Sequence, residues 1–300
     1  MNQIIPISFS DNISVCLKRE DLLHPFISGN KFRKLKYNIA FAKAQQLETL
    51  VTFGGAYSNH IAATAAAAKV NGLQAVGIIR GEELGNDLEQ TLSENPTLHF
   101  AHDQGMKFHF VTRSAYREKE EAATVKALLE SLPSPYLIPE GGSNELAVKG
   151  CTEILTPADA QYNFVCCSVG TGGTLKGLIA AADAHQHILG FPALKSSYIK
   201  DELKDWATHN RWSLINDYHF GGYAKVSKEL ITFMNTFFAD TGILLDPIYT
   251  AKLMYGVYDL IEKGYFPENS RILAIHTGGL QGIAGMNMKL AKKGLPIIHT

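Results

Sequence analysis

The stretch SGNKFRKL at residues 28–35 is the most informative part of this chain. Its lysine, Lys31, lies between a Gly-Asn turn and the expected start of a helix, shortly after an extended stretch at residues 15–23. The helix dipole mildly disfavours a cation at a helix N-terminus, so structure alone gives little reason for this lysine. An amine in this place is well suited to reach the aldehyde of a cofactor. A solvated surface lysine is the alternative, and the rest of the chain has to decide between the two.

The bulk composition is that of a globular protein with a sizeable core. The chain has 300 residues, 46% of them hydrophobic, and a formal net charge of −1. This charge gives no reason to expect a nucleic acid or a membrane as partner. The first residues lack a basic region followed by a long apolar stretch, so we expect no signal peptide, and no apolar run reaches the roughly 20 residues of a membrane span. Four cysteines, with Cys166 and Cys167 adjacent, suggest no disulfide framework and predict a cytoplasmic protein.

Short β-rich runs alternate with helical stretches along most of the chain, which predicts parallel sheets with crossover helices. Strands are expected at residues 49–53, 75–79, 107–111, 163–167, 243–246 and 272–276, and helices at 61–69, 116–132 and 174–182. No repeat and no linker rich in Pro, Gly or Ser divides the chain. We therefore expect two α/β layers that share a cleft, with the chain crossing between them more than once.

A glycine-rich segment, CCSVGTGGTL at residues 166–175, joins an expected strand to an expected helix. Glycines let backbone amides approach an anion, and the helix N-terminus adds partial positive charge. The segment lacks the pattern of a P-loop and gives a poor dinucleotide fingerprint. A tight turn alone requires only one or two glycines. The pattern therefore predicts a loop that binds an anion.

A second glycine pair precedes Ser58 and Asn59 in the segment GGAYSNH at residues 54–60. Both side chains stand just ahead of an expected helix, where such residues usually act as N-caps. Capping explains either residue, but it does not explain the pair together with two glycines. The segment is therefore a candidate ligand-binding turn.

Three further segments lie in the second half of the chain: FGGYAK at residues 220–225, LLDPIYTAK at 244–252 and HTGGLQG at 276–282. Taken alone, the tyrosines of the first two segments have ordinary structural explanations, such as loop packing or a half-buried strand end. Three histidines, His99, His102 and His109, have no carboxylate or cysteine at a familiar spacing, so we expect no metal site.

In this order, from about residue 15 to residue 282, the segments resemble the pyridoxal-phosphate (PLP) enzymes of the tryptophan synthase β fold type (fold type II). Among these they look most like the 1-aminocyclopropane-1-carboxylate (ACC) deaminase and D-cysteine desulfhydrase family. The resemblance implies an α/β fold of two domains, each a mainly parallel sheet flanked by helices, with PLP in the cleft between them. It implies a large domain from residues 1–40 and 145–300, a small inserted domain from 41–144, and a homodimer.

The resemblance also implies how the cofactor is held. Lys31 becomes the Schiff-base lysine, and Lys34, one turn further along the helix, adds a cation to the phosphate. Asn59 bonds the 3′-oxygen of PLP, and Thr250 bonds the nitrogen of its ring. The phosphate loop consists of Val169, Gly170, Thr171, Gly172, Gly173 and Thr174.

For the substrate, an amino acid, the resemblance implies that Ser58 and nearby backbone amides hold the carboxylate, with Asn59 beside them. Tyr223 and Tyr249 stand over the cofactor, where either bonds the carboxylate or moves a proton. His60 replaces a glutamine common in the family. It is either a substrate contact or a neutral residue in the first turn of the helix.

The residue after Tyr249 bears on the reaction. ACC deaminases carry a carboxylate there, which keeps the ring nitrogen protonated, whereas Thr250 is neutral and suits β-elimination better. We therefore expect a lyase similar to D-cysteine desulfhydrase that releases pyruvate, ammonia and sulfide, with the freed Lys31 amine as the base. ACC deamination and a non-catalytic PLP-binding protein are the alternatives. Departures from the family pattern at Ala147 and Cys151 leave the substrate open.

Overall fold

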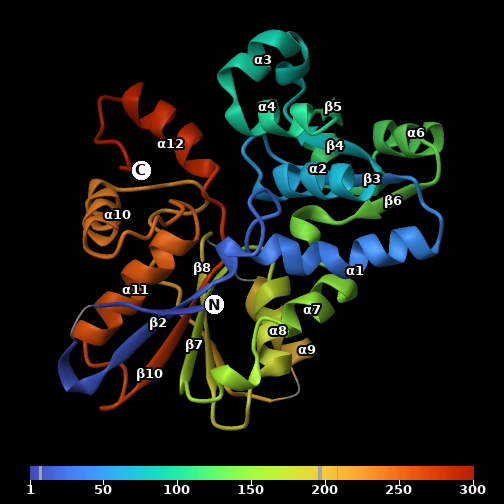
Figure 1. Ribbon diagram of the computed structural model, residues 1–300. Coiled ribbons are helices and arrows are strands. Elements are labelled where there is room, and N and C mark those ends of the chain that lie inside the picture. The colour runs from blue at the N-terminus through green and yellow to red at the C-terminus, as the bar shows by residue number, and fades with distance from the viewer. Residues whose placement is uncertain (7–8, 195–197, 208) are drawn as a thin grey trace. The chain divides into compact units, whose positions relative to one another are not determined.

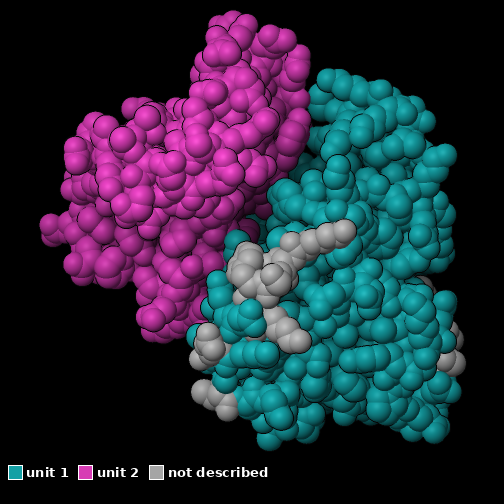
Figure 2. Space-filling model, turned by 180° about the vertical axis from the view of Figure 1, so that it is seen from behind, with its two compact units in different colours: residues 1–23, 28–30, 151–300 teal, residues 24–27, 31–150 magenta. Residues whose placement is uncertain are grey.

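The computed structural model describes residues 1–6, 9–194, 198–207 and 209–300. The chain forms two compact units, coloured separately in Figure 2. Unit 1 contains residues 1–23, 28–30 and 151–300, and unit 2 contains residues 24–27 and 31–150. Because these units are defined by packing alone, the domain bounds expected from the sequence stay a prediction.

Unit 1 is built on a six-stranded sheet that is parallel except for its first edge strand. In sheet order the strands are β1 (Asn2–Ile4), β2 (Ser14–Arg19), β10 (Arg271–His276), β7 (Phe164–Val169), β8 (His187–Pro192) and β9 (Trp212–Leu214). Strands β2, β10 and β7 lie side by side in Figure 1, although they come from distant parts of the sequence. Parallel sheets of this kind need apolar cover on both faces.

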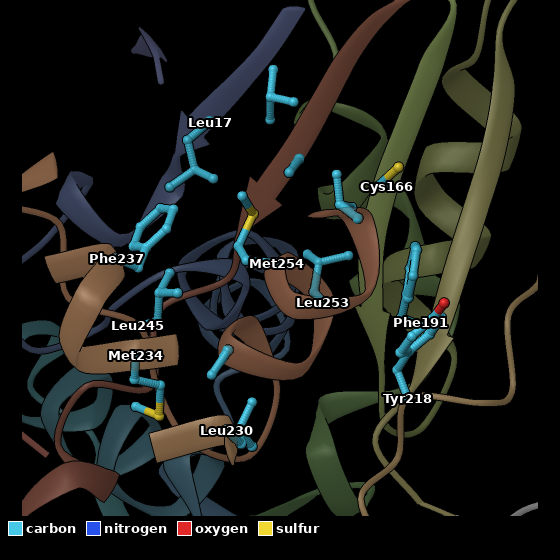
Figure 3. Close-up of a cluster of buried hydrophobic side chains, with 14 of the residues drawn as sticks. Leu17, Cys166, Phe191, Tyr218, Leu230, Met234, Phe237, Leu245, Leu253 and Met254 are labelled. Carbon is cyan, nitrogen blue, oxygen red and sulfur yellow. The ribbon is translucent and has the colours of Figure 1, made fainter. Parts of the chain in front are cut away.

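Helices cover both faces of this sheet. The helices are α8 (Gly173–Ala181), α9 (Tyr198–Trp206), α10 (Lys228–Thr241), α11 (Thr250–Glu262) and α12 (Gly282–Ala291). Figure 3 shows Met254 of α11 and Phe237 of α10 in one apolar cluster with Leu17 and Cys166 of the sheet. Cys167 belongs instead to the cluster formed with α8 and α9. Because neighbouring strand residues point to opposite faces, the two adjacent cysteines serve as small core residues on either side.

Unit 2 has a four-stranded parallel sheet, also covered on both faces. In sheet order its strands are β5 (Met106–Val111), β4 (Gln74–Arg80), β3 (Thr49–Gly54) and β6 (Pro135–Ile138). One face packs against α1 (Asn30–Ala44), α2 (Asn59–Asn71) and α4 (Pro96–Asp103), and the other against α5 (Arg113–Glu118) and α6 (Ala123–Ser131). Helix α3 (Leu88–Glu94) packs beside α4, and α7 (Glu145–Thr152) contains the boundary between the two units.

Short 3₁₀ helices connect several of these elements: η1 (Ser10–Asn12), η2 (Glu20–Leu22), η3 (Glu82–Gly85), η4 (Lys119–Glu121), η5 (Glu140–Gly142) and η6 (Pro157–Asp159). Among the described residues, no helix has the length and apolarity that crossing a bilayer requires.

Most of the expected elements are confirmed. Five of the six predicted strands correspond to β3, β4, β5, β7 and β10, and the helices expected at 61–69 and 174–182 correspond to α2 and α8. The expected fold class, parallel sheets flanked by helices, describes both units.

The single exposed helix predicted over residues 116–132 is wrong. Helix α5 ends at Glu118, Lys119 adopts a left-handed backbone with φ of 55°, and α6 begins only at Ala123. The Lys119 ammonium lies 3.6 Å from the centre of the Tyr116 ring and donates to Glu140 at 2.7 Å. Tyr116 itself is buried, so the turn at Lys119 places its cation against this ring instead of in solvent.

The strand predicted at residues 243–246 is also wrong, because this segment is irregular. Strand β10 is paired on one edge with β2 and on the other with β7, so it offers no free edge to a further strand. The segment instead leads from α10 into α11, and Ile243 and Leu245 are buried in the same core cluster as both helices. A short apolar run fits a buried strand and a buried connection equally well.

Candidate functional site

The predicted phosphate loop connects the end of β7 at Val169 to the start of α8 at Gly173. Gly172, the N-cap of α8, has a left-handed backbone, and no side chain caps the helix there. A helix start of this kind suits an anion, whose oxygens accept hydrogen bonds from the first amides. The side-chain amide (Nδ2) of Asn30 donates to the hydroxyl of Thr174 at 2.8 Å. The residue just before Lys31 is thereby fixed to the first turn of α8.

Two predicted tyrosines lie close to this loop in unit 1. A Cβ placed on Gly170 would come within 3.2 Å of Cε1 and 3.3 Å of the hydroxyl of Tyr249. The glycine therefore lets the Tyr249 ring pack directly on the loop backbone. The rings of Tyr249 and Tyr223 have centres 6.3 Å apart and meet edge to face. The Tyr223 side chain is 45% exposed, which leaves it accessible to a small molecule.

The hydroxyl of Thr250 is held by Asp246, a residue that sequence reasoning did not single out. Asp246 is fully buried, and its carboxylate accepts from the backbone amides of Ile248, Tyr249 and Thr250. The Thr250 hydroxyl accepts from the Asp246 amide at 2.7 Å and donates to its carboxylate at 2.8 Å. To donate to a ring nitrogen, as the resemblance implies, this hydroxyl has to turn away from Asp246. Aspartates often start turns in which their carboxylate accepts from backbone amides two and three residues further along. The structural role of Asp246 could therefore have been predicted from the sequence.

A buried lysine, Lys252, is a second residue that sequence reasoning missed. It lies in the first turn of α11, is 2% exposed, and donates to the carbonyl oxygens of His219 and Gly222 at 2.8 Å and of Ala193 at 3.3 Å. Burial lowers the pKa of this ammonium from 10.5 to about 8, and the charge of Asp246 offsets part of that shift. In the sequence, a single lysine in an apolar helix is only a weak indication that its side chain is buried.

The lowered pKa of Lys252 predicts a pH dependence of stability. Below about pH 8 the charged ammonium destabilises the folded state, and this cost disappears as the pH rises towards 10.5, because the unfolded chain binds more protons in that window. We therefore expect the free energy of unfolding of the wild type to rise relative to that of Lys252→Met between pH 8 and 10.5. Urea denaturation of both proteins at several pH values measures this difference.

The comparison between the two proteins cancels the contribution of tyrosines whose pKa values are raised in the folded state. Tyr218 and Tyr255 have raised pKa values in the folded state, so their ionisation lowers the free energy of unfolding as the pH rises. This effect has the opposite sign to that of Lys252. A difference between wild type and Lys252→Met that stays constant or falls with pH contradicts the prediction.

In unit 2, Lys31 and Lys34 converge on one carbonyl. Lys31 lies in the first turn of α1, and its ammonium donates to the Gly141 oxygen at 3.2 Å. Lys34 is one turn on and buried, and it donates to the same oxygen at 3.0 Å and to the Ser143 hydroxyl at 3.1 Å. Two amines therefore lie together beside the residues that follow β6. The phosphate contact implied for Lys34 stays a prediction.

The predicted ligand-binding turn also belongs to unit 2. Ser58 is the N-cap of α2, and its hydroxyl accepts from the amide of Ile61 at 3.3 Å. Asn59 is the first residue of the helix. A four-residue turn joins the end of β3 at Gly54 to the start of α2 at Asn59, and the carboxyl ends of parallel strands are the usual place for ligands in such sheets.

His60 is buried and neutral. The Thr52 hydroxyl donates its only hydrogen to the Ile138 carbonyl at 2.8 Å, so Nε2 of His60, 2.9 Å away, has to be the donor to Thr52. Burial, followed by the charges of Lys31 and Lys34, lowers the pKa of His60 well below its ordinary value. Its Nδ1 is then an acceptor, which has no hydrogen-bond partner among the described residues. A contact of this atom with substrate stays a prediction.

Each of these groups, taken within its own unit, has chemistry that a phosphorylated aldehyde cofactor requires. The Gly170–Gly172 turn and the start of α8 fit a phosphate, and the glycine at 170 leaves room for Tyr249 beside it. Lys31 supplies a primary amine, which is the group that condenses with an aldehyde. Thr250 supplies a buried hydroxyl next to a carboxylate.

Comparison with known proteins agrees with this chemistry. The sequence profile of the pyridoxal-phosphate dependent enzymes matches residues 4–278. A protein of Pyrococcus abyssi, provisionally named a 1-aminocyclopropane-1-carboxylate deaminase, is 33% identical over 94% of this chain and 89% of its own length. The mitochondrial bifunctional D-cysteine desulfhydrase/1-aminocyclopropane-1-carboxylate deaminase of Arabidopsis thaliana is 32% identical over 89% of this chain and 72% of its own length.

The fold matches as well. The crystal structure of an ACC deaminase homologue covers 97% of this chain and 93% of its own, with a TM-score of 0.84 and 28% identity. The fold class and the cofactor expected from the sequence are therefore confirmed. The chain belongs to the pyridoxal-phosphate dependent enzymes, in the family that contains the ACC deaminases and D-cysteine desulfhydrases.

Proposed function

We propose that this enzyme catalyses α,β-elimination from D-cysteine and releases pyruvate, ammonia and sulfide. The observation that carries the proposal is the neutral Thr250, which follows Tyr249 and is buried at the start of α11. A neutral residue here does not hold a proton on a ring nitrogen in the way that a carboxylate does. That condition suits the loss of a good leaving group from the β-carbon.

In this proposal, each part of the cofactor has an assigned partner in the chain. Lys31 attaches it, the Val169–Thr174 loop with the start of α8 binds its phosphate, and Thr250 and Asn59 contact its ring. When bound, PLP supplies an aldehyde for the substrate amine and an electron-withdrawing ring that stabilises charge developing at Cα.

The chain's own groups then have three tasks. The Ser58 hydroxyl and the first amides of α2 bind the substrate carboxylate, because a helix N-terminus favours an anion. The amine of Lys31 takes the proton from Cα as the bond from the β-carbon to sulfur breaks. Tyr223 or Tyr249 protonates the departing sulfur, and water converts the remaining enamine to pyruvate and ammonia.

The test is a direct comparison of substrates with the purified, PLP-loaded enzyme. We expect D-cysteine to give sulfide and pyruvate in equal amounts, with kcat/KM exceeding that for ACC by about tenfold or more, a difference of ~1.4 kcal/mol in transition-state stabilisation. L-Cysteine is the control for handedness. Formation of 2-oxobutyrate from ACC at the higher rate overturns the assignment.

ACC deamination is the second candidate, and two observations favour it. Relatives such as the Pyrococcus abyssi protein are named for that activity. In addition, the Thr250 hydroxyl already donates to Asp246, which leaves it better placed to accept from a protonated ring nitrogen than to donate to a neutral one. A protein that binds PLP but releases no keto acid from a broad panel of amino acids would support the third possibility, a non-catalytic binding protein.

A further inference from the structure

Lys252 makes an unusual set of contacts for a lysine. Its ammonium has three hydrogens, and each points to a different backbone carbonyl, those of His219, Gly222 and Ala193. Lysine is almost never fully buried without such partners. Two of the three carbonyls belong to residues 219–225, which we call the Tyr223 loop.

The Tyr223 loop has a strained backbone. Phe220 and Ala224 have φ values of 51° and 54°, which residues other than glycine seldom adopt. Such conformations persist only where the surroundings fix them. Inside the loop, the Gly222 amide donates to His219 and the Lys225 amide to Gly222. The carbonyls of His219 and Gly222 therefore each accept both a loop amide and the Lys252 ammonium.

The same lysine connects the loop to the candidate site. Lys252 lies two residues after Thr250 and three after Tyr249, whose ring contacts that of Tyr223. Tyr249 in turn packs on the phosphate loop at Gly170. Fixing the Tyr223 loop to the first turn of α11 therefore fixes the distance between the two tyrosines.

A purely structural role explains this lysine poorly. An apolar side chain in its place would avoid the cost of burying an ammonium, a cost that its lowered pKa reflects. The charge of Asp246 opposes that shift in part. The ammonium gives each of the three carbonyls a charged donor, in addition to the loop amides that His219 and Gly222 already accept, and no apolar group does this.

We propose that Lys252 is a positioning residue that holds the Tyr223 loop, and with it the Tyr223 hydroxyl, in the place that turnover requires. The proposal rests on the role given to Tyr223 in the proposed function. The hold of Lys252 on the loop can be measured without any substrate.

The first experiment is amide hydrogen exchange on the PLP-loaded wild type, Lys252→Met and Lys225→Met. Lys225 lies in the same loop with an exposed side chain, so it is the matched control. We expect the Gly222 and Lys225 amides to exchange about tenfold faster or more in Lys252→Met, because each lost hydrogen bond contributes to closing the loop. We expect Lys225→Met to match the wild type. Unchanged exchange in Lys252→Met overturns the proposal.

The second experiment is a double-mutant cycle on turnover with Lys252→Met, Tyr223→Phe and the pair. If Lys252 acts through Tyr223, the double variant is no slower than the worse single variant, whereas multiplied losses overturn the proposal. Should Lys252→Met fail to fold, Lys252→Gln, which keeps two donor hydrogens, replaces it and is expected to give intermediate exchange. If neither D-cysteine nor ACC is turned over, the proposed function fails while the exchange result still decides whether Lys252 holds the loop.

Discussion

Lys31→Ala is expected to lower turnover by at least ~10³-fold and to abolish the covalent attachment of PLP. The variant lacks the only group assigned both to bind the cofactor covalently and to take the proton from Cα. Loss of a general base alone costs about 10²- to 10⁴-fold in rate, so we expect a fall of at least ~10³-fold. Reduction with borohydride, followed by mass analysis of peptides, shows whether PLP is attached and to which residue.

The matched control is Lys36→Ala, an exposed lysine on the same helix. We expect it to retain both turnover and the reducible adduct on Lys31. We also expect Lys31→Ala to bind PLP without a covalent bond, because the phosphate loop lies on β7 and α8 and keeps its backbone amides. A reducible adduct that persists in Lys31→Ala, on whatever residue, contradicts the assignment.

The elements predicted correctly are those whose pattern is set locally. Strands such as β3 and β4 are short, mostly apolar runs ended by glycine or arginine, and their type follows from burial on both faces of a parallel sheet. The wrong predictions depend on distant partners. The break at Lys119 is set by its contacts with Tyr116 and Glu140, and the irregular segment 243–246 is set by the packing of Ile243 and Leu245 in the core cluster of α10 and α11.

The candidate site shows the same limit. The family motifs led to Lys31, Thr250 and the tyrosines, because those residue types are read from the chain directly. The spacing of residues along the sequence does not predict the hydrogen-bond partners of these side chains. Neither the shared carbonyl of Gly141 nor the three carbonyls around Lys252 is visible before the chain is folded.

Gly29→Ala is expected to destabilise the protein severely, for a reason that also appears only in the structure. Gly29 has a φ of +63°, and a Cβ at this position would lie 1.9 Å from the carbonyl oxygen and 2.2 Å from the carbonyl carbon of Thr277. Both atoms are backbone, so they cannot move aside as a flexible side chain does. The backbone amide of the adjacent Asn30 donates to that same oxygen at 3.3 Å, and this hydrogen bond holds the two chain segments together.

Gly72→Ala separates the two contributions to the loss of stability, which are the left-handed backbone and the collision of the added Cβ. Gly72 ends α2 with a φ of +68°, close to that of Gly29, but a Cβ there meets no atom within 4 Å. The left-handed backbone alone should cost about 1–2 kcal/mol in unfolding free energy. The collision at Gly29 adds to it, so we expect a total above ~4 kcal/mol or failure to fold. Urea denaturation without PLP measures both variants, and equal losses would contradict the prediction. The glycine before Asn30 and Lys31 is then required for backbone packing in unit 1, independently of any contact with the cofactor.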